Sequence, residues 1–362
     1  MKQHQPDYVF IVTVVVLVVF GLAMLLSASS ILGKQQFNDA YYYFKHQLVS
    51  LGIGIALFFI TYLSPYHFFR KISPYALLVN IILLALVFTP LGRSAGGASR
   101  WLHLGPLTFQ PAELLKFSFI VYVAAFFGAR GKKMRKGREG FLTLLVVIGV
   151  IAALLLKQPA TGIFALIVAT VMGMYFVEGA RLRYILFTCM LVGLAIALLV
   201  LVTPYRKARL MTYLNPGVDV QGTGYHINQA LIALGSGGMF GIGFGNSRAK
   251  ASYLPEPIDD SIFALIAEEL GFVGATVLIG LLLLLLVRGF AIARDAPDTF
   301  SQLATVGMVS VVVLQGFINI GSISGLLPIT GLPMPFVSYG GTYLIVVMAC
   351  MGFIANISRH TV

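Results

Sequence analysis

The sequence predicts an all-α polytopic membrane protein, a bundle of about ten transmembrane helices with one large extracytoplasmic loop between the seventh and eighth. Of the 362 residues, 58% are hydrophobic and 10% are charged, and the mean hydropathy is +0.91. A soluble domain carries roughly 25% charge. Apolar runs recur from one end of the chain to the other, so we expect one integral membrane domain over residues 1–362 and no second soluble domain.

Apolar runs of about 16 to 26 residues define the predicted helices. The first run resembles a signal peptide, but it is about twenty residues long and lacks a small-residue cleavage site, so we interpret it as a span. The predicted helices are Val9–Ala28, Leu48–Leu63, Ile72–Pro90, Ala112–Phe127, Phe141–Leu156, Gly162–Glu178, Tyr184–Val202, Ile262–Val287, Leu303–Leu326 and Ser338–Asn356.

Lysine and arginine in the short loops predict the orientation, because cytoplasmic loops carry an excess of both. With the N-terminus inside, the cytoplasmic set is Lys2, Arg70, Lys71, Arg130, Lys132, Lys133, Arg135, Lys136, Arg138, Arg181, Arg183, Arg288, Arg294 and Arg359. The short outside loops hold only Lys34, Lys45, Arg93, Arg100 and Lys157. Both termini are therefore predicted to be cytoplasmic.

The same orientation places the loop of residues 203–261 outside, where we expect the working surface. It is long for a loop without an obvious helical period, and such loops are usually functional or disordered. Its apolar stretch, residues 225–245, argues against disorder and predicts a segment that packs on or dips into the bilayer face.

The charge pattern and the two cysteines argue against a nucleic-acid-binding protein and against a disulfide-linked or metal-binding framework. The net charge of +12 does not indicate nucleic acid, because the aromatic residues lie in apolar runs instead of alternating with a basic stripe. A membrane surface or an anionic lipid substrate explains it better. Cys189 and Cys350 both fall in apolar runs, which indicates buried thiols without a disulfide or metal framework.

The stretch "YLPEPIDDSIFALIAEELG" carries five carboxylates. Asp259 and Asp260 directly precede a helix, where they could cap its free N–H groups or, alternatively, one could act as a general base toward a substrate hydroxyl. Glu256 is interpreted as a supporting residue. Glu268 and Glu269 lie inside the helix, where an ionised carboxylate costs about 2.5–3.5 kcal/mol at mid-bilayer. Adjacent helical residues point about 100° apart, so one is expected to line a cavity and the other to bond a neighbouring helix.

Two further sets of charges are candidates. Glu113 and Lys116 are three residues apart on one helix face and can pair, and charges inside a membrane are by default functional candidates. Cations near the carboxylates suit a diphosphate headgroup, because arginine can form two parallel hydrogen bonds to phosphate oxygens and lysine supplies a point charge. These cations are Arg100, His103, Arg206, Lys207, Arg209, Arg248 and Lys250.

Two glycine-rich segments, residues 235–247 and 331–342, predict tight turns and irregular backbone buried in protein. The first is not a nucleotide fingerprint, because no strand leads into it. The sequence contains no zinc-binding helix motif, P-loop or nucleophile elbow. We therefore expect no covalent catalysis and no nucleotide or organic cofactor.

Four motifs together resemble the SEDS family of shape, elongation, division and sporulation proteins. They are "GGASRWLHLGPLTFQPAELLK", "YLNPGVDVQGTGYHINQALIALGSGG", "YLPEPIDDSIFALIAEELGFVGA" and "GLLPITGLPMPFVSYGGTYL". "INIG" and "NISR" near the end are more similar to the FtsW-like division branch than to the RodA-like elongation branch. The resemblance implies a peptidoglycan glycosyltransferase of the bacterial cytoplasmic membrane. It would polymerise lipid II on the outer face, with a class B penicillin-binding protein as the transpeptidase partner.

The family pattern PExxTDFIFA, laid on "PEPIDDSIFA", implies that Asp260 is the essential aspartate. Asp259 then replaces the usual threonine and Ser261 the usual phenylalanine, which leaves open which acid is the base. The family's glutamate and lysine match Glu113 and Lys116, whereas Ala160 replaces the usual acid of QPDxG.

The resulting hypothesis is an inverting transfer. Asp260 takes the proton of the acceptor hydroxyl, while Lys250 and neighbouring arginines, either alone or with a divalent cation (Mg or Mn), neutralise the departing diphosphate. The alternative is a lipid II flippase, because buried charges and broken helices also suit transporters. The acid and base cluster lies in and beside the outside loop, where a polymerase needs it. A scaffold that only recruits the transpeptidase would leave the buried charges unexplained.

Overall fold

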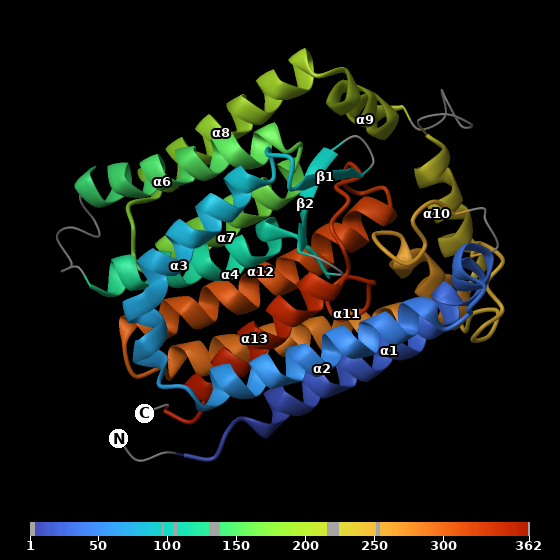
Figure 1. The fold of residues 1–362 in the computed structure, drawn as a ribbon, viewed down its shortest axis with the longest axis horizontal. Coiled ribbons are helices and arrows are strands. Elements are labelled where there is room, and N and C mark those ends of the chain that lie inside the picture. Colours follow the sequence, from blue (N-terminus) through green and yellow to red (C-terminus); the bar gives the residue numbers. More distant parts are fainter. Residues whose placement is uncertain are drawn as a thin grey trace.

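The structure is a computed structural model that describes residues 4–95, 98–104, 107–129, 138–215, 224–250 and 254–360, with the side chains of residues 93–99 and 103–108 outside the described part. The side chain of His103, a predicted site residue, therefore lies outside the described part. Helices dominate the described chain, and both chain ends lie at the same end of the bundle (Figure 1).

The helices follow the predicted order. They are α1 (Tyr8–Phe37), α2 (Tyr42–Leu63), α3 (Tyr66–Leu86), α4 (Pro111–Gly128), α6 (Arg138–Lys157), α7 (Thr161–Val177), α8 (Leu182–Val202), α9 (Pro204–Leu214), α10 (Tyr225–Ser236), α11 (Ile262–Arg294), α12 (Thr299–Ile323) and α13 (Gly341–Ile357). Within the described residues, 8 helices are long and apolar enough to cross a membrane, and α7 and α13 are shorter apolar helices. The chain is a multi-pass helical membrane protein.

Every predicted span overlaps one of these helices, but several ends were misplaced. α2 begins at Tyr42 instead of Leu48, and α3 begins at Tyr66 instead of Ile72. α1 continues to Phe37, beyond the predicted end at Ala28. The apolar-run criterion detects the lipid-soluble part of a helix, whereas the backbone hydrogen bonds continue through the polar and aromatic residues of the membrane interface.

A small antiparallel sheet, with strand order β1-β2-β3, is an exception to the all-α prediction. β1 (Gly92–Ala95), β2 (Ala98–Leu104) and β3 (Leu107–Phe109) connect α3 to α4. These strands are too short and too rich in glycine and turns to give a clear alternating pattern in the sequence.

The loop of residues 203–261 is more regular than predicted, because it contains α9 and α10. α9 buries none of its residues, whereas α10 buries Ile227, Ala230 and Ala233. These three residues recur at helical spacing, and α10 packs on α11. One face of the apolar stretch thus packs on protein, while Ile232, Met239 and Phe240 are exposed, so the predicted contact of residues 225–245 with the bilayer face stays a prediction.

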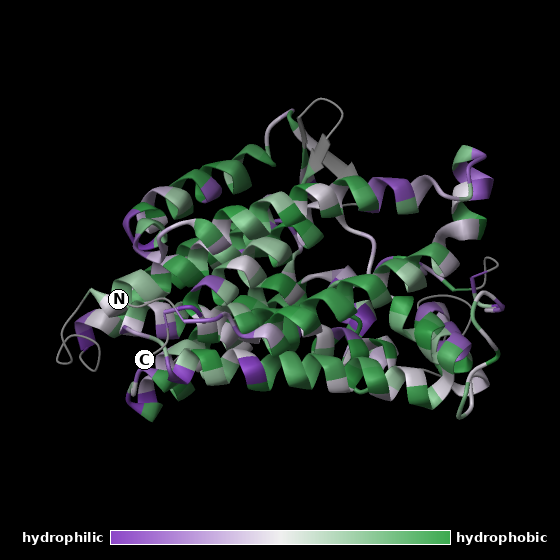
Figure 2. Cartoon of the chain, turned by 90° about the horizontal axis from the view of Figure 1, so that it is seen from below, coloured by the Kyte–Doolittle hydropathy of each residue, from purple (hydrophilic) through white to green (hydrophobic). Residues whose placement is uncertain are grey.

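The centre of the bundle is α12, which packs against α4, α7, α11 and α13, and α13 in turn packs against α2. Small residues permit the second contact, since a Cβ at Gly352 would collide with the Phe58 carbonyl and the Thr61 hydroxyl. α8 lies at the periphery with only Thr188 buried. Hydrophobic residues predominate along the helices and hydrophilic residues are more frequent toward the two ends, as expected for a membrane-embedded bundle (Figure 2).

α11 is broken at Gly271, where φ is 67° and ψ is −166°. The glycine-rich segment 237–245 fills the break. The N–H groups of Ile242 and Gly243 donate to the carbonyls of Glu268 and Glu269 at 3.0 and 3.1 Å. On the other side of the break, the N–H groups of Phe272 and Val273 donate to segment carbonyls at 2.9 and 3.1 Å.

These hydrogen bonds give partners to the free backbone carbonyl and N–H groups on both sides of the break, as a nonpolar environment requires. The segment reaches those groups through left-handed turns, with positive φ at Gly238, Gly241, Gly243 and Gly245. The tight turns predicted for this segment are therefore confirmed.

Replacing Gly271 should destabilise the fold. Gly271→Ala forces a side chain into the left-handed region, which costs about 1–3 kcal/mol, and sets its Cβ 2.5 Å from the Met239 carbonyl. Gly280→Ala is the matched control, since no atom lies within 4 Å of the added carbon in the same helix. We expect thermal unfolding in detergent to show a lower midpoint for Gly271→Ala alone; equal midpoints would refute the role of the break.

Candidate active site

Asp260 lies in the turn that leads into α11, and the main chain of this turn is held from two sides. The Asn319 amide on α12 donates to the Asp260 carbonyl at 2.7 Å, and the Ser338 hydroxyl donates to the Asp259 carbonyl. The N–H of Tyr339 donates to the Ile258 carbonyl at 2.8 Å. The turn is therefore fixed between α12 and the segment that precedes α13.

The Asp260 carboxyl group is not used in this anchoring. Its Oδ1 is buried without a hydrogen-bond partner in the described part of the chain. Its Oδ2 would lie 3.7 Å from a Cβ at Gly331, so a side chain there would approach the carboxyl group. A buried polar atom without a partner costs about 1–3 kcal/mol, and such atoms gather at functional sites.

The capping interpretation of these aspartates is not supported. The N-cap of α11 is Ser261, and it makes no side-chain capping hydrogen bond. Its hydroxyl donates to the Pro255 carbonyl at 2.8 Å and lies 2.6 Å from His226 Nε2. Because the hydroxyl proton is committed to Pro255, Ser261 accepts from His226, so His226 Nε2 carries a proton.

The two aspartates have different surroundings. Burial raises the pKa of Asp260, and the charge of Glu256 raises it further, while His226 and Arg209 lower it. Burial raises the pKa of Asp259 well above its usual range, and a hydrogen bond to Glu256 and the charges of Glu256 and Asp260 add to this. Asp259 is thus paired with another acid, whereas Asp260 faces cations.

A cavity of 360 Å³ lies beside this turn, between α9, α10 and the chain that follows α12. Two of its lining residues, Arg209 and His226, are the same residues whose charge acts on Asp260. Arg209 donates to the Ile329 carbonyl at 3.1 Å and stacks on the Tyr205 ring at 4.6 Å. Most of the remaining lining is apolar or aromatic: Tyr205, Ala208, Tyr213, Ile227, Leu231, Leu327 and Ile329.

The other predicted cations are distributed more widely. Arg206 donates to the Leu156 carbonyl at the end of α6 at 3.0 Å, and Arg100 donates to the Pro159 carbonyl in the connection between α6 and α7 at 2.8 Å. Lys207 and Arg248 are exposed. Of the predicted cations with described side chains, Arg209 is the one that lines the cavity. Substrate contacts of the others stay predictions.

Lys250 points into the protein. It is 5% exposed, and its ammonium lies 3.2 Å from Glu269 Oε1, 3.2 Å from Ser27 Oγ and 2.5 Å from the Gly245 carbonyl. Ser27 on α1 also donates to both oxygens of Glu269 at 2.6 and 2.8 Å. This geometry shows an internal ion pair, and gives no support to the predicted contact between Lys250 and a diphosphate.

Glu268 holds the same loop by other contacts. It accepts from the Ser247 hydroxyl and from the N–H groups of Arg248 and Ala249, the latter two at 3.1 and 3.4 Å. Both glutamates are almost fully buried. The expectation that one of them lines a cavity is corrected here, since both tie the loop of residues 245–250 to the helices.

The predicted pairing of Glu113 with Lys116 is confirmed at 2.6 Å, and both residues are buried. Lys116 also donates to Gln315 on α12 at 2.7 Å. Gln315 donates to the Pro333 carbonyl at 2.8 Å, and Asn319, one turn later, donates to the Leu332 carbonyl as well as to Asp260. The ion pair is thus connected through α12 to the backbone that holds Asp260.

His226, Asn319 and Ser338 were not predicted as site residues. Asn319 carried a signal, because a polar amide inside an apolar run is a functional candidate in a membrane helix. His226 and Ser338 lie beside apolar or glycine-rich sequence, and only the tertiary fold brings them to Asp260.

The described residues do not form a protein site for a divalent cation. No group of three His, Cys, Asp or Glu side chains suited to a metal occurs among them. Glu256 and Asp259 share a hydrogen bond instead of opening toward a common ion. The Mg or Mn of the sequence hypothesis stays a prediction, and no catalytic step is derived through it.

Comparison with known proteins identifies the family. The sequence-family model of the FtsW, RodA and SpoVE cell cycle proteins matches residues 7–362 of this chain. The chain belongs to this family. Stage V sporulation protein E of Bacillus subtilis is 39% identical over 99% of both chains. A Coxiella burnetii protein named "Probable peptidoglycan glycosyltransferase FtsW" is 37% identical over 95% of this chain and 94% of its own.

Solved structures of the family share the fold. A chain of a peptidoglycan synthase complex that coordinates polymerization and crosslinking superposes with a TM-score of 0.80, at 28% identity over 98% of both chains. The RodA protein of Thermus thermophilus superposes with a TM-score of 0.73, at 28% identity over 98% of this chain and 97% of its own. Relatives named for sporulation and relatives named FtsW are both similar to this chain over nearly its whole length.

Breaking the Lys250–Glu269 pair should destabilise this family member strongly. Lys250→Met leaves Glu269 buried without its cation, and we expect a loss of about 3–5 kcal/mol in the free energy of unfolding, measured by titration with SDS. The double variant with Glu269→Gln should lose less than the sum of the single variants. Arg294→Gln is the control, since the Arg294–Asp295 pair is exposed. Equal losses of unfolding free energy in Lys250→Met and Arg294→Gln would contradict a stabilising role of the buried Lys250–Glu269 pair.

Proposed function

We propose that this chain is a peptidoglycan glycosyltransferase that polymerises lipid II at the outer face of the cytoplasmic membrane, with Asp260 as the general base. The observation that carries the proposal is that Asp260 Oδ1 is buried without a hydrogen-bond partner in the described part of the chain, while Arg209 and His226, whose charges act on Asp260, line a largely apolar cavity. Relatives named as peptidoglycan glycosyltransferases support the reaction class.

The reaction needs one proton acceptor. The oxygen of the acceptor sugar hydroxyl attacks the anomeric carbon of the donor sugar, and its proton passes to the Asp260 carboxylate. The bond from that carbon to the diphosphate breaks, and the lipid diphosphate departs with the electron pair. Attack opposite the leaving group inverts the anomeric centre. A positioned base contributes roughly 10²–10⁴ in rate.

The cavity suits the lipid diphosphate. Its tyrosine, leucine and isoleucine side chains offer an apolar wall, and Arg209 provides the forked donors that phosphate oxygens accept. Arg209 is held by the Ile329 carbonyl and by Tyr205, so it is positioned before substrate arrives. Lys207, exposed on the same helix, supplies a second positive charge.

The proposal includes the membrane, the topology and a partner. Both termini are cytoplasmic, as the lysine and arginine distribution predicts, and Asp260 lies on the opposite side. A class B penicillin-binding protein is the proposed transpeptidase partner. It is supported by the structural similarity to a chain of a complex that couples polymerization and crosslinking. Loop accessibility mapped in intact cells tests the topology; a cytosolic Asp260 would end the proposal.

Removal of the base should abolish polymerisation. With its partner on purified lipid II, Asp260→Asn should lower the rate of glycan chain formation by at least roughly 10². Asp259→Asn, next to it in sequence but paired with Glu256, should retain most of the rate. Normal polymerisation by Asp260→Asn would refute the role. Lipid II translocation without polymer, unaffected by this change, would favour the flippase. A chelator added to the same assay tests the divalent cation.

The acid limb of the pH profile should move in opposite directions in two variants. The base works only when ionised, so the rate falls as pH drops through the pKa of Asp260. Glu256→Gln removes a charge that raises this pKa and should shift the limb to lower pH. His226→Asn removes a cation that lowers it and should shift the limb to higher pH. Polymerisation rates from acidic to neutral pH measure both; a shift of both variants in one direction would contradict the assignment.

A further inference from the structure

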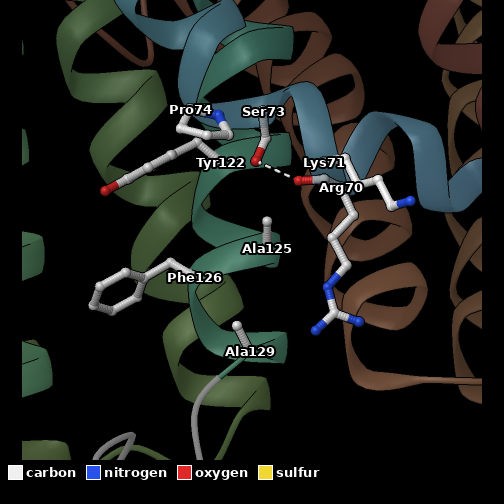
Figure 3. A pocket seen from close by; sticks show the side chains of 8 residues that line it. All are labelled: Arg70, Lys71, Ser73, Pro74, Tyr122, Ala125, Phe126 and Ala129. Atoms are coloured by element: carbon white, nitrogen blue, oxygen red, sulfur yellow. Dashed lines mark hydrogen bonds between the residues drawn. The ribbon is translucent and has the colours of Figure 1, made fainter.

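We propose that a second cavity, at the end of the bundle that carries both chain termini, binds the phosphate headgroup of an anionic phospholipid. This cavity has a volume of 270 Å³ and lies between α3 and the end of α4 (Figure 3). α3 contributes Arg70, Lys71, Ser73 and Pro74, and Tyr122, Ala125, Phe126 and Ala129 form the facing wall. It shares no residue with the cavity beside Asp260.

The cavity has a local cause in the sequence. Pro74 lies inside α3 and has no N–H, so the carbonyl of Arg70, one turn earlier, lacks its helical donor. The Ser73 hydroxyl takes over by donating to that carbonyl at 2.9 Å (Figure 3). On the facing wall, Ala125 and Ala129 have side chains too small to fill the space between the helices.

Arg70 is the cation available to a ligand in this cavity. It is half-buried, and its guanidinium makes one long hydrogen bond within the described residues, to the Gly128 carbonyl at 3.4 Å. None of the described carboxylates pairs with it, whereas Arg288 at the same end pairs with Asp7. A guanidinium has five donors, so most of them remain free for phosphate oxygens. Lys71 adds an exposed positive charge next to it.

The shape favours a phospholipid over a free phosphate. Arg70 lies about one turn inside the start of α3, near the depth of a headgroup phosphate. Tyr122 and Phe126 continue the wall deeper along α4 and offer apolar surface to the glycerol and the first acyl carbons. With both termini cytoplasmic, the site faces the leaflet where anionic lipid and basic residues attract each other.

Native mass spectrometry of the purified full chain with equal amounts of phosphatidylglycerol and phosphatidylcholine tests the proposal. Wild type should retain phosphatidylglycerol preferentially, and Arg70→Gln should weaken that retention about five-fold. Ala125→Leu, which fills the cavity without changing charge, should weaken it as well. Arg181→Gln is the matched control. Arg181 is exposed at the same end of the bundle, and its replacement removes the same charge as Arg70→Gln.

Three results would overturn this inference. Equal weakening by Arg70→Gln and Arg181→Gln would reduce the effect to general surface charge. Equal retention of phosphatidylcholine by wild type would mean that the cavity is only an apolar gap. Displacement of phosphatidylglycerol by millimolar inorganic phosphate would mean that a free anion is the ligand. The inference does not rest on polymerase activity, so it stands or falls separately from the role of Asp260.

Discussion

Polar groups buried in an apolar bundle must find partners inside the protein, and this constraint shapes each irregular part of the molecule. The break in α11 exists only because the glycine-rich segment 237–245 supplies donors and acceptors to both helix ends. The next loop is held by Glu268, Glu269 and Lys250, whose charges are compensated by one another and by Ser27 and Ser247. Removing one member would leave an uncompensated charge, which costs more than the pair contributes.

The same constraint distinguishes polar groups that hold the fold in place from the carboxyl group that is proposed to act as the base. Glu113, Lys116, Gln315 and Asn319 form a connected set that ends on the backbone around Asp260. These residues hold the turn while the Asp260 carboxyl group stays unpartnered on one oxygen. A base that is fixed through its main chain and keeps one carboxyl oxygen without a partner can accept a proton on that oxygen without first breaking a hydrogen bond.

The two cavities illustrate how one bundle offers different chemistry at its two faces. Near Asp260, an arginine held by a carbonyl and a tyrosine faces apolar walls. Near Arg70, Pro74 removes one helical hydrogen bond, and alanines leave space beside a guanidinium with which none of the described carboxylates pairs. In both places a cation with spare donors borders apolar surface, which is the combination that a phosphate-bearing lipid needs.

The sequence by itself determined the helical membrane fold, the order of the spans and the position of the acidic cluster, because lipid solubility and helical hydrogen bonding are local properties. It also indicated the Glu113–Lys116 pair, which depends only on spacing along one helix. Tertiary structure decided the rest. Lys250 was expected at the surface and lies inside, and His226 and Ser338 reach the site from distant segments. Which charges meet a partner and which stay free depends on contacts between helices, and no spacing in the sequence encodes those contacts.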